Sequence, residues 1–223
     1  MTDVLDPRRD VDVVIPTYGE RGEAVRQTLI ACLQQSHPVS RIFVVDDGSP
    51  VPVAIPTDLQ DRPEIHLLRL DKNQGISAAR NAGIKQSKAL FVACVNTQIV
   101  LGADWLNTCM EYVSSRPRVG ACYTRMVPIC PNRILTQWRM RFLETKFGEK
   151  SGPSSFAPGH AVLFRKETLD AVGGYDVRLR LHHEDSDICH RMWQQNWETH
   201  FIAEGWCVSM QEDAFARLAS VVT

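Results

Sequence analysis

Short apolar runs alternate with stretches of helical periodicity through the first half of the chain. Runs rich in β-branched residues are typical of strands, and the segments between them carry apolar residues at the three- and four-residue spacing of a helix. We expect strands over 11–16, 41–45, 65–70 and 90–95 and helices over 24–35 and 77–87. This alternation predicts an α/β protein with a mixed, mostly parallel central sheet flanked by helices.

The second half continues the pattern with longer connections. We expect strands around 120–126, 161–164 and 200–208, and helices ending near 114, over 132–147, shortly after 164 and over about 184–195. The helix at 132–147 has a basic face that we interpret as solvated. Because no repeat or low-complexity linker interrupts the pattern, we predict an N-terminal tail over 1–10 and a single domain over 11–223. Its ligand-binding half is expected at about 11–103 and its second half at about 104–223.

Composition and charge argue against several classes of function and favour none in particular. The 223 residues suffice for a substantial core, and a net charge of −1 with interspersed signs gives no reason to expect nucleic-acid binding. The seven cysteines are odd in number, include no Cys-x-x-Cys pair and fall mostly in apolar segments, which predicts reduced core thiols in the cytoplasm. The first ten residues lack the apolar core of a secretory signal, and no apolar run approaches the about 18 residues of a membrane span. Peripheral contact with a membrane stays open.

Polar clusters follow the first two predicted strands. The first is Pro16-Thr17-Tyr18-Gly19-Glu20 and the second is Asp46-Asp47-Gly48-Ser49. Ligands of open α/β sheets bind beyond the carboxyl ends of the strands, so we expect both clusters at one crevice. A carboxylate and an aromatic ring there can hold a nucleobase by hydrogen bonding and stacking. Asp-Gly-Ser is also a common turn, so neither cluster alone decides between a binding site and an ordinary loop.

A third cluster opens the predicted helix at 77–87. Gly75 and Ser77 precede a run of small residues, and the amides of such a helix start favour anions. Arg80 adds a guanidinium one turn further along, which suits a phosphate. An Ala-rich helix start needs no ligand, so this cluster by itself also permits a purely structural interpretation.

Together these motifs resemble those of the family 2 glycosyltransferases with the GT-A fold. In chain order they are P-T-Y-x-E from Pro16, V-V-D-D-G-S from Val44, N-x-G-I-S-A-A-R-N-A-G from Asn73, G-G-Y-D from Gly173 and H-E-D-S-D-I-C-H-R from His183. The match runs from 11 to about 208, and the joint pattern is specific although its parts are not. The resemblance implies a Rossmann-like GT-A fold and inverting transfer of a sugar from a nucleotide-diphosphate-sugar donor to an acceptor hydroxyl.

The resemblance also implies the donor site. It assigns nucleotide binding to Pro16, Thr17, Tyr18, Glu20, Asp47, Gly75, Arg80, Asn96 and Gln98. Asp47 would meet the edge of a uracil-like base, so a UDP- or dTDP-type donor is expected. Gly75 and Arg80 would lie near the ribose and diphosphate.

The metal motif of the family departs from its usual form here. It aligns with Asn96-Thr97-Gln98, which puts the amide of Gln98 where the metal-binding Asp stands. A neutral amide holds a divalent cation more weakly than a carboxylate, and the His that many members carry after the last strand is missing from 207–212. We therefore expect a degenerate site with little or no need for Mg²⁺ or Mn²⁺. The charge of the leaving group would then be met by Arg80, helix amides, a cation brought in with the nucleotide, or a basic residue of 133–150.

The acceptor side is implied by Glu184-Asp185. In the family the Asp of this pair is the general base that takes the proton of the acceptor hydroxyl, so Asp185 receives that role. Glu184, His160 and Arg191 are expected to bind the acceptor or to orient neighbouring groups. The acidic helix start could also be a solvated one that offsets the helix dipole, and a lone His is more often structural. The acceptor would be a glycan, a lipid-linked sugar or a small molecule.

Other classes fit less well. A non-catalytic glycosyltransferase-like domain that binds a nucleotide or a partner is the main alternative, favoured by the amide at Gln98 and disfavoured by the retained Asp185. A sugar-phosphate nucleotidyltransferase would need a Gly-rich phosphate loop after the first strand, which 17–20 does not supply. A dinucleotide oxidoreductase would need G-x-G-x-x-G after a strand, and no such motif is present.

Overall fold

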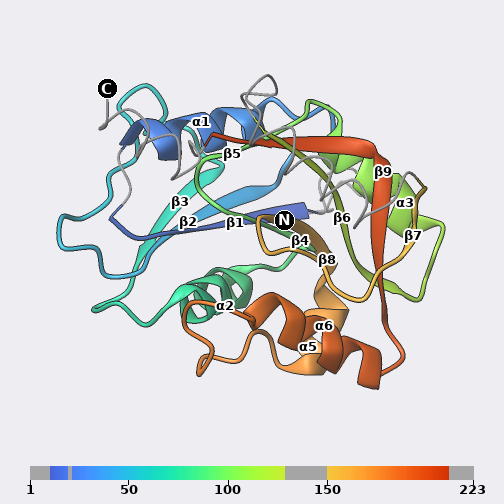
Figure 1. Cartoon of the computed structure of the whole chain (residues 1–223). Coiled ribbons are helices and arrows are strands. Elements are labelled where there is room, and N and C mark those ends of the chain that lie inside the picture. Colours follow the sequence, from blue (N-terminus) through green and yellow to red (C-terminus); the bar gives the residue numbers. More distant parts are fainter. Residues whose placement is uncertain (1–10, 20–21, 129–149, 211–223) are drawn as a thin grey trace, which may run out of the picture.

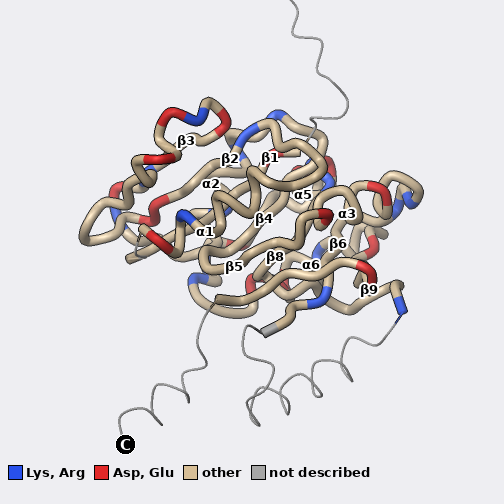
Figure 2. The backbone as a smooth tube through the Cα atoms, turned by 90° about the horizontal axis from the view of Figure 1, so that it is seen from above, with Lys and Arg blue, Asp and Glu red and all other residues tan. Residues whose placement is uncertain are grey.

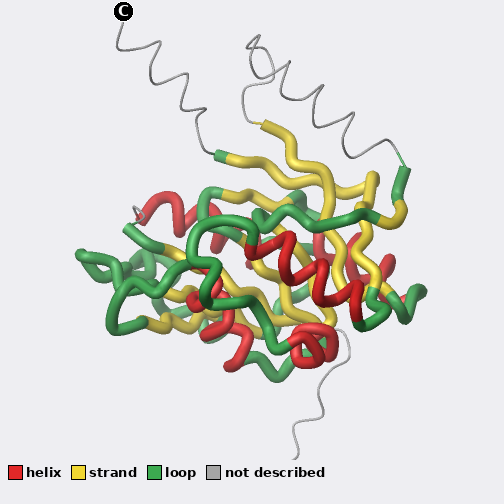
Figure 3. The backbone as a smooth tube through the Cα atoms, turned by 60° about the horizontal axis from the view of Figure 1, so that its bottom comes forward, coloured by secondary structure: helices red, strands yellow, loops and turns green. Residues whose placement is uncertain are grey.

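A central sheet separates two layers of helices, as Figures 1 and 3 show. The computed structural model describes residues 11–19, 22–128 and 150–210. The strands are β1 (Val11–Thr17), β2 (Arg41–Asp46), β3 (Ile65–Arg69), β4 (Phe91–Val95), β5 (Ile99–Leu101), β6 (Val119–Pro128), β7 (Gly152–Pro153), β8 (Ala161–Arg165) and β9 (Glu198–Ser209). The helices are α1 (Gly22–Leu33), α2 (Ile76–Gln86), α3 (Trp105–Ser114), α5 (Lys166–Val172) and α6 (Glu184–Gln194).

The order of the strands places the ends of β1, β2 and β4 side by side. The sheet runs β3-β2-β1-β4-β8-β6-β9-β5, and β7 pairs with β9. The β1, β2, β3 and β4 pairings are parallel, as is that of β6 with β9. The antiparallel pairings are those of β8 with β4 and β6 and those of β5 and β7 with β9. The expected mixed, mostly parallel sheet is confirmed.

Each face of the sheet has its own buried core because successive residues of a strand point to opposite faces. Val13 of β1 packs into the cluster under α1 and α3, whereas Val14 packs into the cluster with α2, α5 and α6. Trp105 of α3 and Ile188 of α6 are fully covered members of the two clusters. Burial of a large apolar side chain contributes about 1.5–3 kcal/mol, so these two layers supply most of the driving force for folding.

The predicted elements agree with the structure to within a few residues at each boundary. Two short strands, β5 and β7, were not predicted from the sequence. They are only three and two residues long, and pairing with β9 rather than any local pattern defines them. The helix predicted at 132–147 and the tail at 1–10 lie outside the described residues. The single-domain organisation stays a prediction.

The described cysteines are free thiols in the core, as expected. They are Cys32, Cys94, Cys109, Cys122, Cys189 and Cys207, and Cys130 lies outside the described residues. Burial raises the pKa of Cys32 and of Cys207 to about 12, so neither is a reactive thiolate near neutral pH. Basic and acidic residues are interspersed along the described chain (Figure 2). None of the described helices has the length and apolar character needed to cross a membrane.

Candidate functional site

A cavity of about 260 Å³ opens beyond the carboxyl ends of β1, β2 and β4, next to the start of α2. It is lined by Pro16, Thr17, Tyr18, Asp47, Gly75 and Asn96, which are six of the nine residues predicted to bind the donor. The parallel pairing of the strands explains why residues far apart in the chain meet here. Glu20 lies outside the described residues.

The ends of β1 and β2 are held together by backbone and hydroxyl contacts. The amide of Asp47 donates to the carbonyl of Thr17 at 2.9 Å, and the amide of Gly19 donates to Ser49 Oγ at 2.8 Å. Tyr18, which follows β1, keeps 48% of its surface exposed beside the cavity. Its ring is therefore available for a flat ligand to stack on.

Asp47 and Asp46 are both buried, but they have different surroundings. The two oxygens of Asp47 accept the amides of Gln74 and Gly75, each at 2.8 Å, and each oxygen keeps a second lone pair. Asp46 bonds inward to Ser49, Val53 and Arg69. Burial alone would raise the pKa of Asp46, yet the bonds from Ser49, Val53 and Arg69 outweigh burial and lower it. Asp47 is thus the carboxylate of this pair that lines the cavity.

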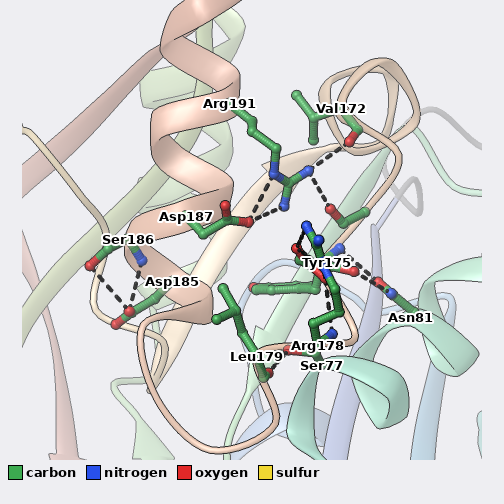
Figure 4. A network of polar contacts seen from close by, with 12 residues as sticks. Ser77, Asn81, Val172, Tyr175, Arg178, Leu179, Asp185, Ser186, Asp187 and Arg191 are labelled. Atoms are coloured by element: carbon green, nitrogen blue, oxygen red, sulfur yellow. Dashed lines mark hydrogen bonds and ion pairs between the residues drawn. The ribbon is translucent and has the colours of Figure 1, made fainter.

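The loop before α6 crosses the start of α2. The amide of Ile76 donates to the carbonyl of Arg180 at 3.1 Å, and Ser77 Oγ donates to the carbonyl of Leu179 at 2.5 Å (Figure 4). Gly75 has a φ of 96°, and a Cβ at this position would come within 2.7 Å of Arg180 Cβ. The close approach requires a glycine, and it brings Arg180 and Leu181 to the cavity wall.

Arg80 is buried behind the cavity, and protein groups hold its guanidinium. Nη1 lies 2.9 Å from Glu184 Oε1, and Nη2 donates to Asn96 Oδ1 at 3.0 Å and to the Gly159 carbonyl at 2.6 Å. The guanidinium also stands 5.0 Å from the centre of the Tyr175 ring. Its predicted contact with ribose or diphosphate stays a prediction. In the structure, Arg80 connects α2 to Asn96 after β4 and to Glu184 at the start of α6.

The segment Asn96-Thr97-Gln98 divides between the cavity and the sheet. Asn96 and Thr97 line the cavity, and Gln98 turns the chain into β5 with a φ of 67°. The carbonyl of Gln98 accepts the amide of Met210 at 2.8 Å. None of the three side chains is a carboxylate, and no group of three His, Cys, Asp or Glu side chains gathers among the described residues. Asn96-Thr97-Gln98 therefore does not fit the acidic metal site that is usual in the family that the motifs resemble.

Asp185 lies half-buried in the first turn of α6. Its Oδ2 accepts the amide of Gly159 at 3.3 Å, and its Oδ1 accepts the amide of Ser186 at 2.8 Å, the latter drawn in Figure 4. His160 follows Gly159, and its Nε2 is covered and has no hydrogen-bond partner among the described residues. Burial lowers the pKa of His160 to about 4; the charge of Asp185 opposes this shift and that of Arg80 adds to it. The imidazole is therefore neutral near pH 7.

Arg191 anchors α6 rather than facing the cavity. Its Nε and Nη2 bond to Asp187 Oδ2 at 2.8 and 2.6 Å, and its Nη1 donates to the carbonyls of Val172 and Gly174 (Figure 4). These contacts fix the helix that carries Asp185, and the orienting role of Arg191 stays a prediction. Asn81 of α2 also makes two hydrogen bonds to the backbone of Tyr175. Its Nδ2 donates to the carbonyl, and its Oδ1 accepts the amide.

Sequence reasoning missed several residues of the cavity wall. Asn73, Thr97, Arg180 and Leu181 line it together with the predicted set. Arg180 is 107 positions from Asn73, to which it donates hydrogen bonds, and no local motif links the two. Its place after Gly-Gly-Tyr-Asp and before Glu184-Asp185 was the only available signal.

Comparison with protein-family models matches residues 12–173 to Glycosyl transferase family 2. A pre-mycofactocin glycosyltransferase of Mycobacterium tuberculosis (strain CDC 1551 / Oshkosh) is 27% identical over 82% of this chain and 39% of its own length. A glucosyl-dolichyl phosphate glucuronosyltransferase of Haloferax volcanii is 25% identical over 84% of this chain and 64% of its own length. The chain thus spans less than two thirds of these relatives.

Solved structures with the same fold support this result. The structure of GalNAc-T7 with UDP, GalNAc and Mn²⁺ has a TM-score of 0.72 at 13% identity, covering 92% of this chain and 44% of that one. The structure of S. aureus TarS 1-349 in complex with UDP has a TM-score of 0.69 at 15% identity, covering 89% and 60%. At such identities the likeness shows the fold alone, and it confirms the expected GT-A architecture.

Proposed function

Because this chain belongs to glycosyl transferase family 2, we propose that it transfers a sugar, with inversion, from a nucleotide-diphosphate-sugar donor to an acceptor hydroxyl. The observation that carries the proposal is the cavity itself, where Tyr18, Asp47 and Asn96 meet from the ends of β1, β2 and β4 beside Gly75 at the start of α2. Asp185 stands at the start of α6, with its carboxylate held by the amides of Gly159 and Ser186. Arg80 bonds to Gly159 and to Asn96 of the cavity wall, and these contacts link the candidate base to the cavity.

The donor is proposed to be of the UDP or dTDP type. Uracil and thymine both present an N3–H, which the free lone pair of an Asp47 oxygen can accept while the ring stacks on Tyr18. Both GalNAc-T7 and TarS 1-349 are described with UDP, which supports this class by analogy. Because its described cysteines are free thiols, as is usual for proteins of the reducing cytosol, we propose that the domain works in the cytoplasm.

The proposed chemistry is a single displacement at the anomeric carbon. The acceptor oxygen attacks this carbon from the face opposite the diphosphate and forms the new bond. The bond from the anomeric carbon to the diphosphate oxygen breaks, and its electron pair leaves with that oxygen. Asp185 takes the proton of the acceptor hydroxyl, a step that typically contributes about 10²–10⁴-fold to the rate. Arg80, by pairing with Glu184, holds the turn that carries this base.

The side chains of Asn96, Thr97 and Gln98 supply no carboxylate to hold a divalent cation. Charge on the departing diphosphate is instead assigned to protein donors near the start of α2. The acceptor is proposed to be a glycan, a lipid-linked sugar or a small molecule, since the relatives are named for acceptors or products of different kinds.

A thermal-shift panel tests the donor site. UDP, dTDP, GDP and their sugar derivatives are added to the protein, and the melting temperature is recorded for each. A ligand that binds the folded state alone raises the melting temperature by mass action, so UDP or dTDP species are expected to give the largest rise. In Asp47→Ala this rise should disappear. A panel in which no nucleotide stabilises the protein would refute the proposal.

A non-catalytic nucleotide-binding domain is the second candidate, and the amide at Gln98 favours it. The two candidates differ in turnover, not in nucleotide binding. Donor and a mixture of acceptors are incubated with the wild-type protein and with Asp185→Asn, and release of nucleoside diphosphate is followed. Release by the wild type alone supports the enzyme. Equal release from both proteins would remove Asp185 from the mechanism, whereas no release from either at saturating donor supports the binding domain.

A further inference from the structure

Arg180 differs from the arginines around it in the groups that contact its guanidinium. Arg80 pairs with Glu184, Arg178 with Asp176, and Arg191 with Asp187. Arg180 lies on the same loop as Arg178, yet no carboxylate within the described chain pairs with it. Its hydrogen bonds go from Nη2 to the carbonyl of Asn73 at 2.9 Å and to Asn73 Oδ1 at 3.0 Å.

These bonds hold the guanidinium at the wall of the cavity. The backbone of Arg180 is itself fixed, because its carbonyl accepts the amide of Ile76 and its Cα packs against Gly75. The side chain is exposed and lines the cavity together with Tyr18 and Asp47. Within the described residues, its Nε and Nη1 donate no hydrogen bond, so N–H groups on either side of Nη2 are available to a ligand.

The distribution of charge in the cavity indicates which part of a ligand would meet Arg180. Asp47 is the acidic residue of the cavity wall and stands at the β2 end, where the proposed base-binding groups are. Arg180 is the basic residue described on that wall, and it approaches from the loop before α6. Both side chains hold the 73–75 segment, Asp47 through the amides of Gln74 and Gly75 and Arg180 through Asn73. A ligand that carries both a hydrogen-bonding base and phosphates matches this pair of opposite charges.

We propose that Arg180 binds the diphosphate of the nucleotide-sugar donor and stabilises the charge that develops on it when the sugar leaves. This inference rests on the proposed function. Asn96-Thr97-Gln98 offers no carboxylate that would hold a metal ion at the diphosphate. In this proposal the guanidinium of Arg180 takes the place of that ion. A guanidinium suits the role because it stays charged near neutral pH and donates charge-assisted hydrogen bonds to phosphate oxygens.

The test separates phosphate binding from base binding. Isothermal titration calorimetry measures the affinities of wild type, Arg180→Ala, Arg180→Lys and Arg178→Ala for UDP, uridine, dTDP and thymidine. Arg178→Ala is the matched control, since Arg178 is an exposed arginine of the same loop that pairs with Asp176. Loss of one charge-assisted contact predicts about tenfold weaker diphosphate binding in Arg180→Ala. Uridine or thymidine affinity should be unchanged, Arg180→Lys intermediate, and Arg178→Ala like the wild type.

Each other outcome has a separate meaning. Equal diphosphate affinity in the wild type and Arg180→Ala would overturn the role of Arg180 and leave the proposed function standing. An equal loss for nucleosides and diphosphates would assign Arg180 to the shape of the loop and overturn its phosphate role. A wild-type protein that binds none of the four compounds would overturn the proposed function itself.

Discussion

Arg80 and Glu184 form a buried ion pair across the interface of α2 and α6, with Nη1 and Oε1 2.9 Å apart. The two side chains keep 1% and 9% of their surface exposed. Glu184 immediately precedes Asp185, so the pair sets the position of the proposed base relative to the cavity. Arg80, the arginine of the motif from Asn73 to Gly83, thus stabilises the site without lining the cavity.

Replacing Glu184 by Gln should destabilise the protein strongly. The variant leaves the guanidinium of Arg80 buried without its counter-charge, a change that typically costs about 3–5 kcal/mol. Urea denaturation of both proteins measures the difference. Asp170→Asn is the control, because Asp170 pairs with Lys166 on the surface of α5 and its loss should cost under about 0.5 kcal/mol. Similar small losses in both variants would contradict the structural role of the buried pair.

Asp185→Asn should reduce sugar transfer by at least about a hundredfold, because an amide cannot accept the proton of the acceptor hydroxyl. The amide oxygen can still accept from Gly159 and Ser186, so the helix start should persist. Initial rates of nucleoside diphosphate release measure the loss, and calorimetry with UDP checks that donor affinity is retained. Unchanged turnover would remove Asp185 from the mechanism.

Gly75→Ala should weaken nucleotide binding and folding stability together. Its φ of 96° is unfavourable for alanine, and the added Cβ would lie within 2.8 Å of three atoms of Arg180. Gly173→Ala separates the two effects, since Gly173 has a φ of 73° but no atom within 4 Å of such a Cβ. We expect a loss of about 1–3 kcal/mol in Gly173→Ala and a larger one in Gly75→Ala. Equal losses would mean that contact with Arg180 adds nothing.

The stability of the fold should fall with acidification partly through His160. Burial lowers its pKa in the folded chain to about 4, against 6.5 for the ordinary group. Unfolding then takes up a proton between these two values, so the free energy of unfolding decreases as the pH drops from 6.5 toward 4. Urea denaturation across this range should show a shallower decline in His160→Gln than in the wild type. Parallel declines would show that the ring is protonated as easily in the fold as outside it.

Removal of divalent cations should change UDP affinity by less than about twofold. The described residues assemble no acidic metal site, and Gln98 offers an amide where a carboxylate would be needed. Calorimetry in excess EDTA, compared with added Mg²⁺ or Mn²⁺, measures the effect. A loss of about tenfold or more in EDTA would mean that a cation is held after all. Gln98→Asp provides the converse experiment, since new stimulation by metal would support the alignment of this segment with the metal motif.

Apart from β5 and β7, the described elements followed from the sequence because each of them has a local cause. The β-branched run of β1 and the apolar spacing of α3 predict their own conformation, and their boundaries moved by only a residue or two. Cavity residues at strand ends were also predictable, since the ends of parallel strands must meet at one edge of the sheet. Asp47, Gly75 and Asn96 belong to this group.

The fold class, the family and the edge of the sheet where the cavity opens could all be read from residue patterns along the chain. The burial of Arg80 against Glu184 and the approach of Arg180 to the cavity wall became visible only once the chain was folded. The physical reason is that all arginines carry the same guanidinium. Burial and the nearest carboxylate decide whether its charge is neutralised within the protein or remains available to a ligand. Those contacts join residues about a hundred positions apart, and no local pattern encodes them.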